Sequence, residues 1–295
     1  MNRSHHPRAT GHTLVVRSIG NRGANRPRVA AAMVLAAAFG FAGSCLAQGK
    51  VVVGGAGSMV PVMQELARAY EARSGPQGFE ILTNSLGSGG GIKGVEAGRL
   101  AIGLTGRPLK DSEKSAGVYR QLAVMPVVVA VHGSVPVDGI TAAQLCGIYT
   151  GTITSWKQVG GPDLPIVPLT RNEDDSDKEA LRDHVACYKG LKESADVVVL
   201  SSGGGMKSSL AGRPGSIGLT TYDAILKGEG KLKPLAIDGV APTPETVAAG
   251  KYKVVKDFAV VTKGEPAGPV KGLVDFALSA DGRKILVNGG LVPRR

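Results

Sequence analysis

The sequence predicts an α/β protein in which short buried strands alternate with helices. Its 295 residues are enough for one large domain or two modest ones. Glycine accounts for 43 residues and aromatic side chains for only 4%, a balance that suits many tight junctions between strands and helices. Several apolar runs lead into polar, glycine-containing segments and then into helical patterns. Because the carboxyl ends of parallel strands share one edge of a sheet, these segments predict a ligand site there.

Residues 1–47 have the composition of a targeting signal. They contain six arginines and no acidic residue, an apolar run from Val29 to about Phe41, and small residues up to Ala47. The run is shorter than the roughly 20 strongly apolar residues of a membrane-spanning helix. We predict a signal peptide over residues 1–47 and a periplasmic protein, with lipoprotein anchoring at Cys45 as the alternative.

The formal net charge of +11 is weak evidence for a nucleic-acid partner. More than half of it comes from the arginines of the predicted signal peptide, and the rest is scattered without a basic stripe. We therefore expect no nucleic-acid partner.

The cysteines agree with export. If Cys45 leaves with the signal peptide, Cys146 and Cys187 remain, which is an even number in an oxidising compartment. Both fall in segments with helical patterns in the same half of the chain. We predict a disulfide between them, and the alternative is a pair of buried free thiols.

The first strand and helix follow the predicted cleavage site. Val51–Val53 has the pattern of a short buried strand, and apolar residues from Val60 to Tyr70 repeat at helical spacing. We expect Ser58 to cap this helix and Pro61 to lie in its first turn, where its missing N–H costs nothing. Ser58 would then lie at a junction between strand and helix.

A glycine-rich segment, Asn84–Gly94, follows the next predicted strand, Phe79–Leu82. Glycine adopts positive φ readily and lets the backbone approach a ligand without interference from a Cβ. We interpret the segment as a loop with a helix that starts at Ile92, and as a candidate anion-binding nest to which Ser88 adds a hydroxyl donor. A plain turn is the alternative.

A third polar loop, which contains Arg107, follows the predicted strand Leu100–Leu104. Three successive strands therefore end in loops that carry Ser58, Ser88 and Arg107. In an open parallel sheet we expect these three side chains to converge.

The second half of the chain begins with a long apolar strand, Leu122–Val131, that leaves the first lobe. Thr141 and Gln144 form a capping box for a helix that runs to Tyr149, and Trp156 is expected to be a packing residue. The further predicted strands are residues 166–169, 196–200, 216–219, 235–237 and 254–261, and the further helices are residues 178–187, 269–278, 281–287 and one from residue 206.

A fourth polar loop, residues 170–177, joins a predicted strand to a helix. Arg171 in this loop is a candidate to clamp an anion with its planar guanidinium group. The alternative is that Arg171 pairs with Glu173 or Asp174 on a solvated loop.

The sequence contains no recognisable catalytic set. Outside the predicted signal peptide, His132 and His184 are far apart and have no cysteine or carboxylate partners at metal-ligand spacing. Neither a nucleophile elbow nor a phosphate-loop lysine motif is present. We predict neither an enzyme nor a cofactor.

Five motifs together resemble the periplasmic phosphate-binding proteins of ABC importers, over nearly the whole mature chain. They are Gly55–Met59, Leu86–Gly91, Ile102–Leu109, Leu145–Gly151 with Ser155–Trp156, and Arg213–Gly218. The resemblance implies a two-lobed type II periplasmic binding protein fold, in which each lobe is an open, mostly parallel sheet flanked by helices. It implies lobe 1 over residues 48–130 and 256–295, lobe 2 over residues 131–255, and crossover strands near Val128 and Lys256.

The resemblance also implies a function. The protein is expected to capture phosphate or a related oxyanion between its lobes, as a monomer, and to deliver it to an ABC permease in the inner membrane. The implied ligand-binding residues are Ser58, Met59, Ser88, Gly89, Arg107, Arg171, Asp175 and Ser176.

Two departures from the family pattern concern the ligand. Gly106 stands where the family often has an aspartate that accepts the proton of hydrogen phosphate, and Asp175-Ser176-Asp177 replaces a Ser-Gly-Thr that donates to the anion. Two like charges about 4 Å apart repel by about 4 kcal/mol at an effective dielectric constant near 20. If both carboxylates face the cleft, we expect weakened phosphate binding that improves as the pH falls.

Two alternatives follow from the same departure. In the first alternative, Asp175 and Asp177 are both exposed to solvent and only favour the start of the helix that follows them. In the second, the protein is an exported sensor or interaction protein that keeps the fold with a degenerate anion site.

Overall fold

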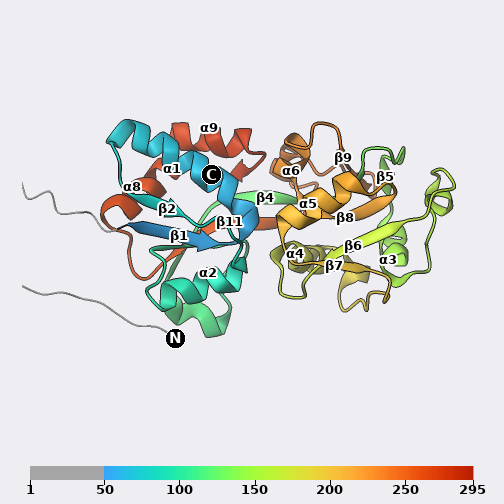
Figure 1. Ribbon diagram of the computed structural model, residues 1–295, viewed down its shortest axis with the longest axis horizontal. Coiled ribbons are helices and arrows are strands. Elements are labelled where there is room, and N and C mark those ends of the chain that lie inside the picture. Colours follow the sequence, from blue (N-terminus) through green and yellow to red (C-terminus); the bar gives the residue numbers. More distant parts are fainter. Residues whose placement is uncertain (1–49, 295) are drawn as a thin grey trace, which may run out of the picture. The chain divides into compact units, whose positions relative to one another are not determined.

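The computed structural model describes residues 50–294, so the predicted signal peptide and Cys45 lie outside the described residues. Helices and strands alternate along the described chain (Figure 1). The α-helices are α1 Val60–Ser74, α2 Gly87–Glu96, α3 Ala142–Thr150, α4 Ser176–His184, α5 Gly203–Gly212, α6 Tyr222–Leu226, α7 Pro244–Ala248, α8 Gly268–Leu278 and α9 Ala280–Asn288. The 3₁₀ helices are η1 Gly57–Met59, η2 Asp111–Ala116, η3 Trp156–Val159 and η4 Ala186–Tyr188. None of the helices described has both the length and the apolar character needed to cross a bilayer.

The strands form a mixed sheet. They are β1 Val51–Gly55, β2 Phe79–Ile81, β3 Ile102–Thr105, β4 Val118–His132, β5 Gly139–Ile140, β6 Val167–Arg171, β7 Val198–Leu200, β8 Ser216–Thr221, β9 Leu232–Pro234, β10 Ala236–Ile237, β11 Val255–Thr262 and β12 Val292–Pro293. Within the described chain, the main sheet has the order β2-β1-β3-β11-β4-β8-β6-β7, and β9 and β12 also pair with β4. The outer strands pair in parallel, as predicted, whereas β4 and β11 pair with their neighbours in the antiparallel direction.

Strand β4 serves two halves of the sheet. Its first part, Val118–Pro126, pairs with β11, and its second part, Val127–His132, pairs with β8 and β9. Alternate side chains of a strand point to opposite faces. In the second part, Val128 and Ala130 accordingly pack in one hydrophobic cluster while Val127 and its period-two neighbours pack in another.

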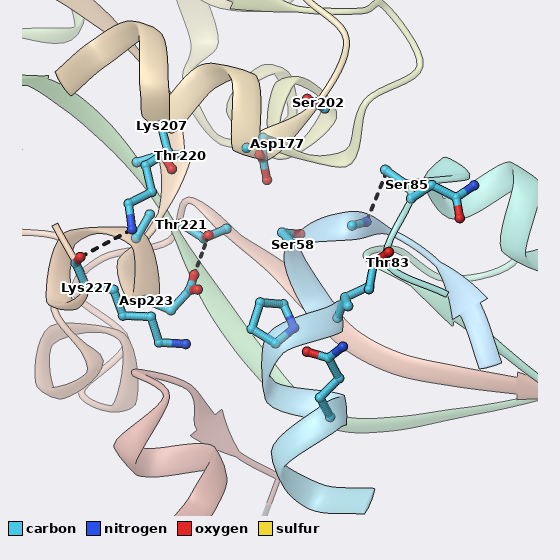
Figure 2. Close-up of a pocket in the computed structure, with 18 residues that line it drawn as sticks. Ser58, Thr83, Ser85, Asp177, Ser202, Lys207, Thr220, Thr221, Asp223 and Lys227 are labelled. Carbon is cyan, nitrogen blue, oxygen red and sulfur yellow. Dashed lines mark hydrogen bonds between the residues drawn. The ribbon is translucent and has the colours of Figure 1, made fainter. Parts of the chain in front are cut away.

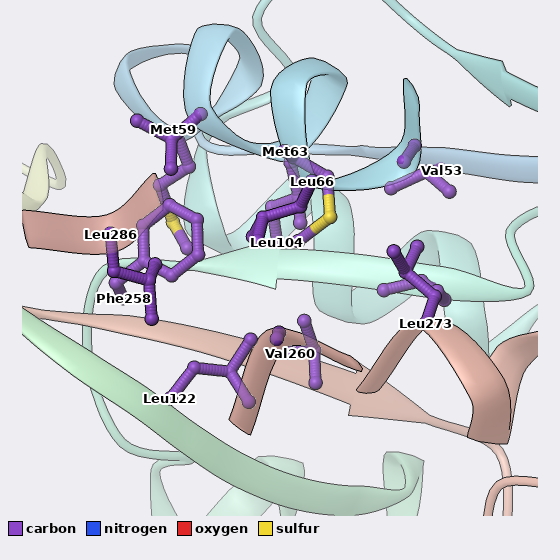
Figure 3. Packing of buried hydrophobic residues seen from close by; sticks show 14 of the residues in the cluster. Val53, Met59, Met63, Leu66, Leu104, Leu122, Phe258, Val260, Leu273 and Leu286 are labelled. Atoms are coloured by element: carbon purple, nitrogen blue, oxygen red, sulfur yellow. The ribbon is translucent and has the colours of Figure 1, made fainter. Parts of the chain in front are cut away.

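The hydrophobic clusters divide the described chain into two lobes. We call lobe 1 the part built from β1–β3, the first part of β4, β11, β12 and the helices α1, α2, α8 and α9, and lobe 2 the part between them in sequence. Helices α1, α8 and α9 cover one face of the lobe 1 strands and α2 covers the other (Figure 1). Figure 3 shows how Met63 and Leu66 of α1 meet Leu104, Leu122 and Val260 of the sheet. The lobe boundaries predicted at particular residues stay predictions.

Helix α2 begins earlier than the sequence suggests. The glycine-rich segment expected to be a loop up to Ile92 is helical from Gly87. A Cβ on Gly91 would lie 2.8 Å from the carbonyl oxygen of Leu104 and 3.0 Å from Cα of Gly55. The helix therefore rests directly on β1 and β3, and at this position glycine is required for close packing. Helix α5 likewise starts at Gly203 instead of residue 206.

Two alanine substitutions in α2 test this packing. We expect Gly91→Ala to lower the free energy of unfolding by about 1 to 3 kcal/mol, because the added methyl group meets backbone atoms that have no room to move. Gly89→Ala is the matched control: a Cβ there meets nothing within 4 Å, so the better helix propensity should raise stability by up to about 1 kcal/mol. Urea unfolding measures both, and equal values for the two variants would contradict the close approach.

Three other predictions for lobe 2 are confirmed. The side chain of Thr141 caps α3 together with Gln144 in a capping box. Trp156 is fully buried, and its indole Nε1 donates to the carbonyl of Gly215 at 2.9 Å. A disulfide joins Cys146 in α3 to Cys187. Cys187 lies in η4 and not in a helix that runs to residue 187, since α4 already ends at His184.

Candidate functional site

A charged junction connects the two lobes. The ammonium group of Lys256, on β11, donates to Ser58 Oγ at 2.8 Å and forms an ion pair with Oδ1 of Asp177, the second residue of α4. Lys256 and Asp177 are each only 4% exposed. Ser58 does not cap α1 as expected, because it lies in η1 and the N-cap residue is Met59. Its hydroxyl is therefore available to Lys256.

Asp175 organises the start of α4. It is the N-cap residue, and its Oδ1 accepts from the backbone N–H of Asp177 at 2.9 Å. Its Oδ2 accepts from Nη2 of Arg171 at 2.6 Å, while Nη1 of Arg171 donates to the carbonyl of Leu200 at 2.9 Å. Arg171 is 5% exposed, and its Nε has no hydrogen-bond partner among the described residues. The guanidinium group thus keeps one buried donor for a further acceptor.

The expectations for this loop need correction. Asp175 and Asp177 are neither unpaired acceptors aimed at the ligand nor simply solvent-facing, because each has a cationic partner within the fold. The predicted pairing of Arg171 with Glu173 or Asp174 is also wrong, since Arg171 pairs with Asp175 and Glu173 pairs with Lys178 and Arg182. The prediction that these carboxylates favour the start of a helix is confirmed for Asp175, which is the N-cap residue of α4.

The two carboxyl groups differ in their electrostatic environment. Burial raises the pKa of Asp177, and the neighbouring Asp175 raises it further, while Lys256 opposes both effects. Burial also acts to raise the pKa of Asp175, but Lys256 and Arg171 outweigh it and hold that pKa below its ordinary value. Asp177 is therefore the carboxyl group of this pair that takes a proton first as the pH falls.

Ser88 joins the site through the neighbouring loop. It is buried in the first turn of α2, and its Oγ accepts from the backbone N–H of Gly106 at 3.0 Å. A Cβ on Gly106 would lie 2.5 Å from Oγ of Ser176, on the other lobe. The lobes are therefore in direct contact here, and the glycine leaves room for Ser176. Gly89 follows Ser88 in the same turn of α2.

Arg107 stays a predicted ligand residue: it lines a second cavity with Ser176 and Lys256, while its side chain is held by an ion pair. Its guanidinium group donates to both carboxylate oxygens of Glu113, at 2.7 and 2.9 Å, and its Nε lies 3.5 Å from Glu179. Through this hydrogen bond Arg107 lowers the pKa of Glu113 to about 2. A bidentate ion pair with a neighbouring helix fixes Arg107 and satisfies its charge.

Met59 stays a predicted ligand residue. Its side chain is fully buried in the core of lobe 1, and its backbone N–H donates to the carbonyl of Ala56 at 3.0 Å. This N–H is thus engaged within η1.

A cleft of about 560 Å³ lies beside the junction, between the lobes. Ser58 and Asp177 face each other at one end of it, and Lys207, Lys227 and Asp223 lie across the cleft from them (Figure 2). Asp223 is buried and accepts from the hydroxyl of Thr221 at 2.5 Å. Hydroxyl groups and charges of both signs therefore border a space open to a small polar ligand.

Sequence reasoning missed the role of Lys256, which it treated only as part of a crossover strand. One signal was present: Lys256 falls in phase with Val254, Phe258 and Val260, all of which are buried. A lysine at a core-facing position is costly unless it is paired. Such a position therefore indicates a charged site.

The described residues contain no group of three or more histidine, cysteine or acidic side chains that could hold a metal ion. What the arrangement can do is bind an anion. An ammonium group, a hydroxyl group and the spare donor of a buried arginine lie around the point where the lobes meet. Two lobes that share crossover strands, with a charged site between them, define the class of bilobed solute-binding proteins.

The chain belongs to the PBP superfamily, whose domain model matches residues 42–281. It is similar to the phosphate-binding protein PstS of Bacillus subtilis strain 168, with 29% identity over 281 residues that cover 90% of this chain and 91% of the relative. A protein from Clostridium perfringens, described as a phosphate ABC transporter substrate-binding protein and solved with bound phosphate, is 31% identical, with a TM-score of 0.76 over 83% of this chain and 100% of that one. An ABC-type phosphate transport receptor from Vibrio cholerae, at 24% identity and a TM-score of 0.64 over 83% of this chain and 100% of its own, shows the same fold.

Proposed function

We propose that this protein captures phosphate or a related oxyanion between its lobes and delivers it to an ABC permease. The observation that carries the proposal is the buried contact of the Lys256 ammonium group with Ser58 Oγ where the lobes meet. A buried cation with a hydroxyl neighbour is a suitable partner for a small anion. Family membership and the phosphate-binding relatives support the same ligand class.

Both lobes contribute to the proposed site. Lobe 1 supplies Ser58 and, in the first turn of α2, Ser88 and Gly89, whose position at a helix N-terminus favours negative charge. Lobe 2 supplies Ser176 at the start of α4 and Arg171, which Asp175 orients. Lys256 on β11 lies between them. Arg107 and Met59 remain further candidate ligand residues, although the Arg107 side chain pairs with Glu113 and the Met59 backbone N–H donates to Ala56.

The cellular role follows from the class of protein. We propose an exported protein that acts as a monomer, with the N-terminal segment as its signal peptide and lipid anchoring at Cys45 as the lesser route. Its partner is a permease of the inner membrane, and no catalytic step is assigned. The sensor or interaction protein with a degenerate site is not favoured, since the phosphate-binding relatives cover about nine-tenths of the chain.

Calorimetric titration of the mature chain with phosphate and with sulfate tests this function. We expect saturable binding of phosphate at one site, and a loss of at least about tenfold in affinity for Ser58→Ala, because a hydrogen bond to a charged group is removed. Ser74→Ala is the matched control, since that hydroxyl is bonded to the carbonyl of Tyr70 at the far end of α1. If neither phosphate nor sulfate gives a binding signal at pH 6 or at pH 8, the proposal is refuted.

A further inference from the structure

The position on Lys256 that a bound anion needs is already taken by a carboxylate of the protein. Asp177 contacts the ammonium group directly, and this ion pair spans from α4 of lobe 2 to the crossover strand β11. Both side chains are almost completely buried. A carboxylate in this position has the same charge sign and the same kind of acceptor oxygens as a small oxyanion.

We propose that Asp177 is an internal competitor of the ligand, so that the affinity and the pH dependence of anion binding are set by an exchange between its carboxylate and the incoming anion. The inference rests on the proposed function and deepens it. Asp177 is then a specificity-determining residue: only an anion that displaces its carboxylate, or that binds once this carboxylate has taken a proton, reaches Lys256. The first route exchanges only ion pairs and hydrogen bonds, and in the second a proton from solvent binds the Asp177 carboxylate.

The surroundings of Asp177 favour exchange over simultaneous binding. The charged groups that face it are Lys256 on β11, Asp175 at the start of its own helix and Arg171 on β6. Arg171 already pairs with Asp175, so Lys256 is the cation left to balance Asp177. An anion at Lys256 would therefore bring a second negative charge against Asp177 in a buried place, which is costly.

The cleft offers space for the Asp177 side chain when an anion displaces it from Lys256. Asp177 borders the 560 Å³ cleft, which Ser202 and Lys207 also line. A carboxylate that leaves Lys256 can turn toward this polar space. Protonation is the second route, and the rise in the pKa of Asp177 that burial causes brings this route closer to neutral pH. In both cases the ion pair between α4 and β11 opens when the anion enters.

The test compares two carboxylates of the same cleft. Inorganic phosphate is titrated by calorimetry into the wild type, Asp177→Asn and Asp223→Asn, from pH 5.5 to 8. Asp223→Asn removes the same charge from the same cleft but leaves Lys256 untouched, since Asp223 bonds to Thr221. Asp177→Ser is a second variant that removes the carboxylate with a smaller side chain, in case the amide disturbs folding.

We expect Asp177→Asn and Asp177→Ser to bind phosphate at least tenfold more tightly than the wild type at pH 8, and Asp223→Asn to change affinity by less than about threefold. Phosphate titrates in the same pH range. The decisive quantity is therefore the ratio of variant to wild-type affinity, which should shrink toward one as the pH falls and Asp177 takes a proton.

The outcomes separate the inference from the function. If the wild type binds phosphate and the Asp177 variants bind it equally or more weakly, or if the ratio is independent of pH, Asp177 is not a competitor and the proposed function stands. If Asp223→Asn raises phosphate affinity as much as the Asp177 variants do, the effect comes from the net charge of the cleft and the inference is also overturned. If neither the wild type nor any variant binds phosphate or sulfate, the proposed function fails as well.

Discussion

Replacing Lys256 with methionine is expected to lower the free energy of unfolding by about 3 to 5 kcal/mol and to abolish anion binding. Asp177 would be left as an uncompensated charge in a buried place, which is among the more destabilising single changes. Methionine is a suitable replacement because it keeps much of the length and apolar volume of the lysine stem. Urea unfolding at pH 7 and phosphate calorimetry measure the two effects.

The pH dependence of this loss has a definite sign. Without Lys256, the folded-state pKa of Asp177 lies above its unfolded value, because burial and Asp175 raise it and the opposing cation is gone. The variant is therefore least affected below the unfolded pKa, near 4, and loses stability as the pH rises. The deficit relative to the wild type should grow between pH 4 and pH 7.

A double variant provides the control. Lys256→Met combined with Asp177→Asn removes both charges, so most of the stability should return while phosphate binding stays lost. A Lys256→Met protein that is as stable as the wild type at pH 7 would show that Asp177 carries no buried charge. Recovery of binding in the double variant would show that Lys256 is not the anion's partner.

Removal of the disulfide is expected to lower the free energy of unfolding by about 4 kcal/mol. The bridge between Cys146 and Cys187 closes a loop with a sequence separation of 41, and the chain-entropy model gives about this value for that length. The paired variant Cys146→Ala and Cys187→Ala is compared with the wild type in urea without reductant. Phosphate affinity should not change, because neither cysteine borders the cleft.

Thiol chemistry supplies the second measurement for the bridge. Exported wild-type protein, denatured without reductant, should resist alkylation at both cysteines and become reactive after reduction. Alkylation of both before reduction, or unchanged stability of the alanine pair, would refute a structural role for the bridge.

Local sequence signals predicted most of the elements. The capping box at Thr141 placed the start of α3, and long apolar runs placed most of the crossover strands β4 and β11. Each of these signals is contained within a few neighbouring residues, so it can be read without knowledge of the fold. The cysteine pair was predictable for a different reason, since an even count in an exported chain leaves few options.

The start of α2 could not be predicted in the same way. Glycine is a poor helix former, so a segment with Gly89, Gly90 and Gly91 favours a loop by its intrinsic propensity. The helix forms because Gly91 lets it lie against the backbone of Gly55 and Leu104. This contact is between segments far apart in the chain, and tertiary packing overrides the local preference.

The charged site was the hardest part to predict. The family pattern indicated Ser58, but its partner Lys256 lies 198 residues later, and Asp177 lies 79 residues before that lysine. The position of Lys256 in phase with buried residues indicates that it is buried, but the sequence does not indicate which distant residues it pairs with. Arg107 has a local partner that the sequence analysis did not name: its side chain pairs with Glu113, only six residues away.

The first and the last parts of the described chain pack together in lobe 1. The core of lobe 1 combines Met63 and Leu66 with Phe258, Leu273 and Leu286, so it stays incomplete until the last helices have been made. The two cores of lobe 2 come from one continuous stretch, residues 127–254. Contacts between distant residues cost more loop-closure entropy than contacts within one stretch. The cores of lobe 2 therefore need only one continuous stretch of chain, whereas the binding site needs β11, which lies between β3 and β4 and carries Lys256.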